Sequence, residues 1–317
     1  IKNQKQIFLI MKRKEFISLA GLTSFGLMLP SEILEKLTNA KNKISLAQWS
    51  MNKSLFSGKK NPLNFPRYAA ELGFDGVEYV NQFYFDYLKS GSTSSRKVKT
   101  LANKLNRNAR DNDISNVLIM VDLEGELASS QSKKMLASVN QHKKWVELAA
   151  ELDCESVRVN LSGSNDADEW VKRSVEGLTV LSEFAKQHDL NIIVENHGGF
   201  SSNGAMLAEV MRQTDIENCG TLPDFGNFCI RGGYDGCDEW YDMYRGVAEL
   251  MPYAKSVSAK SYDFDINGDE TKINYSRMIK IVKDNNYKGF IGVEYEGNNL
   301  SENNGIIATK KLIHRFL

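Results

Sequence analysis

The sequence has no excess of charge of either sign. Forty lysine and arginine residues are balanced by forty aspartate and glutamate residues, and no long basic run occurs along the chain. Proteins that bind along the phosphate backbone of nucleic acids usually carry clustered positive charge. The composition therefore argues against a nucleic-acid partner.

Cysteine and histidine are also scarce, with four residues of each. The cysteines, Cys154, Cys219, Cys229 and Cys237, show no C-x-x-C spacing, so they do not predict a zinc site. Because free cysteine is common in protein cores, we expect buried free thiols. The short separation of Cys229 and Cys237 also permits a disulfide between them.

Long hydrophobic runs are missing, and the one apolar segment near the N-terminus is too short to span a bilayer comfortably. The basic run Met11–Lys14 precedes an apolar body between Phe16 and Leu29, which is the layout of a secretory signal. The stretch KRKEFIS resembles a twin-arginine signal with one arginine replaced by lysine. We expect residues 1–42 to contain an upstream remnant and an export segment, and the mature chain to have no stable membrane domain. The protein is then periplasmic or membrane-tethered, with a cytoplasmic location as the less favoured alternative.

From residue 43 to residue 317 the chain alternates between short apolar runs and longer segments of helical periodicity, such as Ser132–Leu152. The predicted strands are Ile44–Ser50, Gly76–Val80, Asn116–Val121, Ser156–Leu161, Asn191–Glu195, Gly220–Asp224, Ser256–Lys260 and Phe290–Tyr295. Strands separated by helices pair in parallel, and eight such units predict a single (β/α)₈ TIM barrel. An open doubly wound sheet is the alternative, but the first strand ends AQWSMNK, without the glycine-rich turn that such sheets usually carry.

Polar side chains concentrate at the ends of the predicted strands. The stretch NIIVENHGG, residues 191–199, passes directly from an apolar run to Glu195 and His197. In a TIM barrel the C-terminal strand ends form the active site, and residues two apart share a face. The other candidates at these positions are Glu78, Arg158, Asn160, Asp224, Asn227, Ser258, Lys260, Glu294 and Glu296.

Three of these residues, Glu195, Asp224 and Glu294, are carboxylates that would repel one another at short range. A divalent cation such as Mg²⁺ or Mn²⁺ removes this repulsion, because it prefers oxygen ligands, and it assists proton abstraction next to a carbonyl. Pairing of the acids with Arg158 and Lys260 in a metal-free network is the alternative.

The motifs VENHGG, LPDFGNF and GFIGVEYEG, at residues 194–199, 222–228 and 289–297, resemble the xylose-isomerase-like TIM barrels, a superfamily of sugar isomerases and epimerases. The resemblance extends over residues 43–317. In that family a glutamate, an aspartate, a histidine and a glutamate on strands five to eight hold one divalent metal. The resemblance places Glu195, Asp224 and Glu294 in this metal site, for which their oxygen donors favour Mn or Mg. It also implies that Glu195 and Glu294 act as acid and base on opposite faces of the substrate.

Strand seven departs from the family pattern, which is histidine, any residue, lysine, aspartate. The chain reads Ser258-Ala259-Lys260-Ser261, so a serine stands at the position of the metal-binding histidine. A serine hydroxyl is a much weaker ligand than imidazole. Glu296 faces the same way as Glu294 and can supply the missing group. Asn227 stands where the family often has a further histidine.

The leading functional prediction is a sugar isomerase or epimerase that works through an enediolate, with a small carbohydrate as its partner. Residues expected to contact the sugar are Glu78, Arg158, Asn160, His197, Asn227, Lys260 and Glu296. The alternatives are a lyase or dehydratase acting on keto-sugars or keto-glycosides, and a barrel that only binds carbohydrate. Four histidines and zero net charge argue against the apurinic-site endonucleases of the same superfamily, and many family members form homodimers, which is possible here too.

Overall fold

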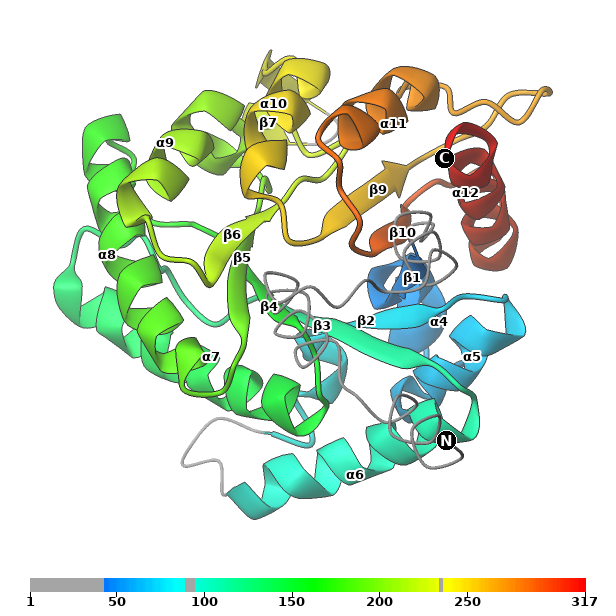
Figure 1. The fold of residues 1–317 in the computed structure, drawn as a ribbon, viewed down its shortest axis with the longest axis horizontal. Coiled ribbons are helices and arrows are strands. Elements are labelled where there is room, and N and C mark those ends of the chain that lie inside the picture. The colour runs from blue at the N-terminus through cyan, green and yellow to red at the C-terminus, as the bar shows by residue number, and fades with distance from the viewer. Residues whose placement is uncertain (1–42, 89–94, 234–235) are drawn as a thin grey trace, which may run out of the picture. The chain divides into compact units, whose positions relative to one another are not determined.

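The computed structural model describes residues 43–88, 95–233 and 236–317 (Figure 1). The predicted export segment, residues 1–42, lies outside these ranges. Residues Asn42–Leu317 form one structural unit. Within the described ranges, none of the helices has the length and hydropathy that a membrane crossing needs.

The barrel predicted from the sequence is confirmed. Its strands are β1 Ile44–Ala47, β2 Gly76–Val80, β3 Ser115–Val121, β4 Ser156–Val159, β5 Asn191–Glu195, β6 Cys219–Leu222, β9 Val257–Ser261 and β10 Ile291–Tyr295. Seven neighbouring pairs are parallel, in the order β6-β5-β4-β3-β2-β1-β10-β9. The register pairs Glu294 of β10 with Lys260 of β9. Both side chains therefore start from neighbouring positions on the inner face of the sheet.

The first and last strands of this order, β6 and β9, meet at a seam without a regular ladder. Isolated parallel bridges join Thr221 to Ala254 and Asp224 to Ser258. The amide of Phe225 donates to the carbonyl of Ser258, and the amide of Ser258 donates to the carbonyl of Pro223. The main chain at the seam thus places Asp224 directly beside Ser258.

Helices follow the strands and cover the outside of the sheet (Figure 1). The longer ones are α5 Phe65–Glu71, α6 Ser95–Asp111, α7 Ser132–Glu151, α8 Ala167–Lys186, α9 Gly204–Thr214, α10 Met243–Leu250, α11 Tyr275–Asp284 and α12 Glu302–Phe316. Each presents an apolar stripe to the strands, as α7 does with the fully buried Trp145 and Val146. Ile192 and Val194 of β5 pack in this outer layer.

The inner face of the barrel has only a small apolar cluster, formed by Ala47, Val80, Val117, Leu118, Met120, Ile193, Leu222 and Phe290. Towards the C-terminal strand ends the inward positions are polar instead, and they are nevertheless buried. Burying ionisable groups is costly unless they are paired or hydrogen-bonded. The buried polar residues therefore indicate that the functional site lies at the C-terminal end of the barrel.

A hairpin between β6 and α10 was not predicted from the sequence. Its antiparallel strands, β7 Cys229–Gly233 and β8 Gly236–Trp240, are joined by a disulfide between Cys229 and Cys237. The expectation of buried free thiols is therefore wrong for these two residues, since a separation of 8 residues across a hairpin brings the sulfur atoms together. Cys154 is a buried free thiol, and Cys219 is free and half-buried.

Candidate active site

Three carboxyl groups converge at the C-terminal end of the barrel. Glu195 ends β5, Asp224 follows β6, and Glu294 lies in β10. One carboxylate oxygen from each lies within 4.8 Å of the others, and all three residues are buried. The structure therefore brings together the three acids that the sequence places at three separate strand ends.

Ser258 of β9 lies between two of these acids. Its hydroxyl is 2.7 Å from Asp224 Oδ2 and 2.9 Å from Glu294 Oε2. A hydroxyl has one proton to donate, so it satisfies one ionised carboxylate, and the second contact is favourable when that carboxyl carries its own proton. Serine thus bridges the two acids by hydrogen bonds at the position where the family pattern has histidine.

Lys260, also on β9, supplies a positive charge beside the acids. Its Nζ lies 3.2 Å from Glu294 Oε1, 3.1 Å from Glu296 Oε1 and 3.9 Å from Asp224 Oδ2, and only 1% of the side chain is exposed. Burial alone would lower the pKa of Lys260, but Asp224 and the glutamates outweigh it and raise this pKa. Lys260 is therefore a permanent cation in the centre of the site.

Arg158 of β4 forms the second positive centre. Its Nε makes an ion pair with Glu195 Oε2 at 2.8 Å, without the alignment of a hydrogen bond, and its Nη1 donates to Asp122 Oδ1 at 2.6 Å. The amide of Asn160 donates to the same Asp122 oxygen, and the amide of Asn227 donates to Glu195 Oε1. Each acid at this end of the barrel thus has a cationic or amide partner.

Burial and charge move the pKa values of the acids in opposite directions. Burial raises the pKa of Glu195 to about 7 and that of Asp224 to about 7, and neighbouring acids add to both shifts. Burial also acts on Glu294, but Lys260 and Arg158 outweigh it and lower the pKa of this carboxyl. Glu294 is therefore ionised at neutral pH, whereas Glu195 and Asp224 retain protons to higher pH.

A cavity of about 570 Å³ opens above these groups. Five of the residues predicted to form the site line it: Arg158, Asn160, His197, Glu294 and Glu296. Within the described ranges, the other predicted residues, Glu78, Glu195, Asp224, Asn227, Ser258 and Lys260, lie outside its lining. Of the three carboxylates, Glu294 lines the cavity, whereas Glu195 contacts Arg158, which lines it.

Glu78 of β2 lies deeper in the barrel than the sequence suggests. It has no exposed surface, it accepts a hydrogen bond from Ser45 Oγ at 2.5 Å, and a Cβ at Gly292 would clash with its carboxyl group. Burial raises the pKa of Glu78 from its ordinary value of 4.5 to about 8. The residue is therefore a neutral acid of the barrel interior at physiological pH.

The stability of the protein should depend on pH through Glu78. A carboxyl whose folded-state pKa is raised stabilises the fold fully below its unfolded pKa, and this contribution is lost as pH rises towards the folded value. Between pH 4.5 and 8 the free energy of unfolding should fall by up to about 1.4 kcal/mol per pH unit on account of this group. Glu78→Gln removes this part of the slope in urea titrations at several pH values. The exposed Glu71→Gln serves as control, and an unchanged slope in Glu78→Gln contradicts the assignment.

Two acids of the site were missed from the sequence. Asp122 follows β3 directly and anchors both Arg158 and Asn160. Glu124 accepts from Trp145 Nε1 and pairs with Lys144, with both distances 2.7 Å, and it also lines the cavity. An acid directly follows the apolar run of β3, just as acids end or follow β5 and β6. The same pattern could therefore have identified Asp122 from the sequence.

The trio of acids fits a divalent cation by its donor chemistry. Three carboxylate oxygens within 4.8 Å provide the hard ligands that Mg²⁺ and Mn²⁺ prefer. The fourth nearby oxygen belongs to Ser258. Lys260 balances part of the same negative charge, so a cation held by the three acids would share that role with it.

Comparison with known proteins points to one family. The family model described as xylose isomerase-like TIM barrel matches residues 66–313. A comparison with curated proteins found no match. Solved structures are similar in fold at low sequence identity. A 3-keto-D-glucoside 4-epimerase from E. coli is 13% identical with a TM-score of 0.64, over 87% of this chain and 100% of that one.

Two further structures show the same fold. A D-psicose 3-epimerase from Clostridium cellulolyticum, solved with D-tagatose, is 12% identical with a TM-score of 0.64, over 87% of this chain and 99% of that one. The IolI protein, solved with a bound zinc atom, is 15% identical with a TM-score of 0.62, over 87% of this chain and 99% of that one.

Proposed function

Since this chain belongs to the xylose isomerase-like TIM barrel family, we propose that it is a sugar isomerase or epimerase that abstracts a proton next to the carbonyl of a sugar or keto-sugar. One observation carries the proposal. Glu195, Asp224 and Glu294 converge to within 4.8 Å at the C-terminal end of the barrel, and Glu294 lines the cavity. The pKa of Glu294 is lowered and that of Glu195 is raised, which agrees with a base and an acid in this site.

In this proposal Glu294 takes the proton from the carbon next to the carbonyl, because it is ionised and reaches the cavity. Lys260 stays charged and stabilises the negative charge of the enediolate that results. Glu195, whose pKa is raised, is the proposed source of the returned proton; it lies outside the cavity lining and contacts Arg158, which lines the cavity. Return to the other face of the carbon gives an epimer, and return to the neighbouring carbon gives an isomer.

Glu195, Asp224 and Glu294 are the residues that would hold a divalent ion, with Mn or Mg favoured by their oxygen donors. Such an ion, when bound, polarises the substrate carbonyl and so makes the neighbouring proton more acidic. The zinc atom in the IolI structure supports a metal in a barrel of this fold. This site differs from the family pattern at Ser258, whose hydroxyl is a weaker metal ligand than the histidine expected there.

The substrate is proposed to be an uncharged sugar. Arg158 is already paired with Asp122 and Glu195, and Lys260 with Glu294 and Glu296, so neither cation is free to bind a phosphate. Asn160, His197 and the Asp122 carboxylate offer donors and acceptors for hydroxyl groups at the cavity wall. The names of the similar structures, a keto-glucoside epimerase and a D-psicose epimerase, agree with a keto-sugar.

Export from the cytoplasm is part of the proposal. The Cys229–Cys237 disulfide supports it, because structural disulfides persist mainly in oxidising compartments. The signal-like segment of the sequence agrees with this location.

The test of the proposed function is solvent-deuterium incorporation. The purified chain, with Mn²⁺ added, is incubated in D₂O with a panel of ketoses, and the products are identified by NMR. We expect exchange of the proton next to the carbonyl, with an epimer or aldose as product. Metal content is measured beside an Asp224→Asn variant, in which we expect the bound metal to disappear.

An unsaturated or dehydrated product would contradict isomerisation and support the lyase or dehydratase alternative. Absence of exchange in every ketose, together with no metal in either protein, would overturn the proposal. The metal-free network of the acids with Arg158 and Lys260 would then support a carbohydrate-binding barrel.

A further inference from the structure

A second cavity, of about 580 Å³, lies beside the central one. Glu296 lines both cavities, so the two cavities adjoin at this side chain. The other residues that matter for its chemistry are Trp240, Met243, Tyr262, Lys272 and Asn298. The proposed reaction does not use this space.

The second cavity is built from the same end of the barrel as the first. Tyr262 follows β9 directly, Asn298 follows β10, and Met243 begins α10. Trp240 ends β8, the second strand of the disulfide-bonded hairpin. A molecule in the central cavity that extended past Glu296 would therefore enter this space without crossing the barrel wall.

The lining combines aromatic rings with polar groups, which is the composition that suits a sugar ring. Trp240 is 54% exposed, an unusual degree for tryptophan. Lys272 Nζ lies 4.4 Å from the centre of the Tyr262 ring. Glu296 and Asn298 add a carboxylate and an amide at the rim. Aromatic faces cover the C–H surfaces of a pyranose, while the polar groups reach its hydroxyls.

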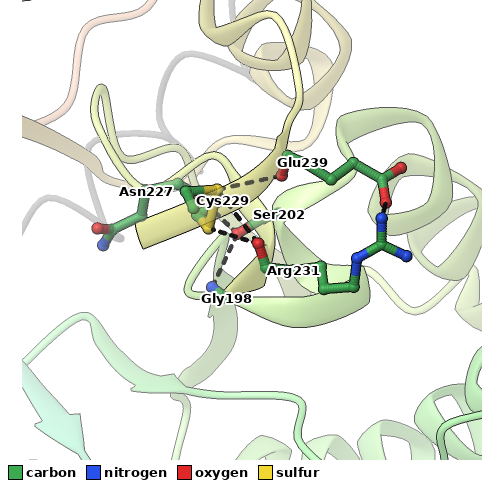
Figure 2. Close-up of a disulfide and its surroundings, with 7 residues drawn as sticks. Gly198, Ser202, Asn227, Cys229, Arg231 and Glu239 are labelled. Atoms are coloured by element: carbon green, nitrogen blue, oxygen red, sulfur yellow. Dashed lines mark hydrogen bonds and ion pairs between the residues drawn. A yellow bond between two sulfur atoms is a disulfide. The ribbon is translucent and has the colours of Figure 1, made fainter. Parts of the chain in front are cut away.

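Two features hold the aromatic residues in place. The disulfide joins the hairpin strands beside Trp240, because Cys229 is the register partner of Trp240. Figure 2 shows Ser202 next to this disulfide, where it accepts a hydrogen bond from the Gly198 amide and donates one to the Asn227 carbonyl, both at 2.8 Å. The hairpin is thus tied to the loop that follows β5.

Gly226 gives Tyr262 its position on the other side of the cavity. A Cβ at residue 226 would lie 2.8 Å from Tyr262 Oη and 2.9 Å from Lys260 Cγ, closer than real Cβ contacts. The absence of a side chain at residue 226 therefore leaves room for both Tyr262 and Lys260.

We propose that the second cavity binds a further sugar ring of the substrate, so that the protein acts on a glycoside or disaccharide whose reacting ring occupies the central cavity. This inference rests on the proposed function for the identity of the reacting ring. Trp240 is its main specificity-determining residue, through stacking on the second ring.

The experiment compares a ketose with ketose disaccharides. Isothermal calorimetry measures binding of D-fructose, lactulose, turanose and isomaltulose to the full chain and to Trp240→Ala. We expect at least one disaccharide to bind about tenfold more tightly than D-fructose to the original protein, and we expect Trp240→Ala to remove this advantage. Trp240→Phe keeps an aromatic face and should retain most of it.

Leu136→Ala is the matched control, since Leu136 is an exposed apolar residue, 47% accessible, on α7. It should leave the ratio of affinities unchanged. The inference is overturned if the original protein prefers no disaccharide over D-fructose, or if the preference survives in Trp240→Ala. Binding requires no turnover, so a disaccharide preference without deuterium exchange would contradict the proposed reaction and leave the second-ring site standing.

Discussion

Replacing Glu294 by glutamine is expected to lower kcat for proton exchange by about 10²–10⁴-fold, because an amide cannot accept the substrate proton. Glu294 lines the cavity and is held ionised by Lys260 and Arg158. Glutamine keeps the size of the side chain and its contact with Ser258, so folding should be preserved. The measurement is the rate of deuterium incorporation into the best ketose or ketose disaccharide at saturating concentration.

Glu296→Gln provides the comparison. Glu296 faces the same cavity and contacts the same lysine, at 3.1 Å, but it lies outside the trio of acids. We expect its loss to raise KM more than it lowers kcat, as for a group that binds the substrate rather than reacts with it. If Glu294→Gln keeps most of the original kcat, the assignment of the base is wrong.

Replacing Lys260 by methionine should destabilise the metal-free protein by about 3–5 kcal/mol. The lysine is 1% exposed and lies between 3.1 and 3.9 Å from three carboxylates. Methionine fills a similar volume but leaves the buried acids without their cation. The measurement is urea unfolding at neutral pH in the presence of a chelator.

Added Mn²⁺ should restore part of the lost stability, because an ion bound only by the folded state shifts the unfolding equilibrium. The control is Lys280→Met, which removes an exposed pair with Asp284 and should cost about 1 kcal/mol or less. If both variants lose the same free energy of unfolding, the buried Lys260 contributes no more to stability than an exposed lysine.

The strands and the convergence of the acids follow from short-range patterns in the sequence. Apolar runs bounded by polar residues locate β5 and β10, and a period of two assigns Glu195 and Glu294 to the inner face. Parallel pairing then brings the strand ends together, since all of them point to one end of the barrel. This reasoning needs no knowledge of the loops.

Pairing between side chains does not follow from such patterns. Arg158 contacts Asp122 as well as Glu195, which depends on the register between β3 and β4 and on the rotamer of a long side chain. The hairpin that carries Trp240 is an insertion between β6 and α10, and its polar, glycine-containing sequence shows no strand alternation. The second cavity depends on side-chain pairing and on this hairpin, so it could not be predicted from the sequence.

The seam between β6 and β9 is the part of the barrel where we expect local opening to be easiest. Hydrogen exchange is fastest where few ladder hydrogen bonds protect an amide, and here isolated bridges stand in place of a ladder. The amides of Phe225 and Ser258 bond across this seam, on the same residues that hold Asp224 beside its serine. An opening that exposes these amides to solvent also separates Asp224 from Ser258, so the exchange protection of these two amides reports the free energy of opening of this part of the site.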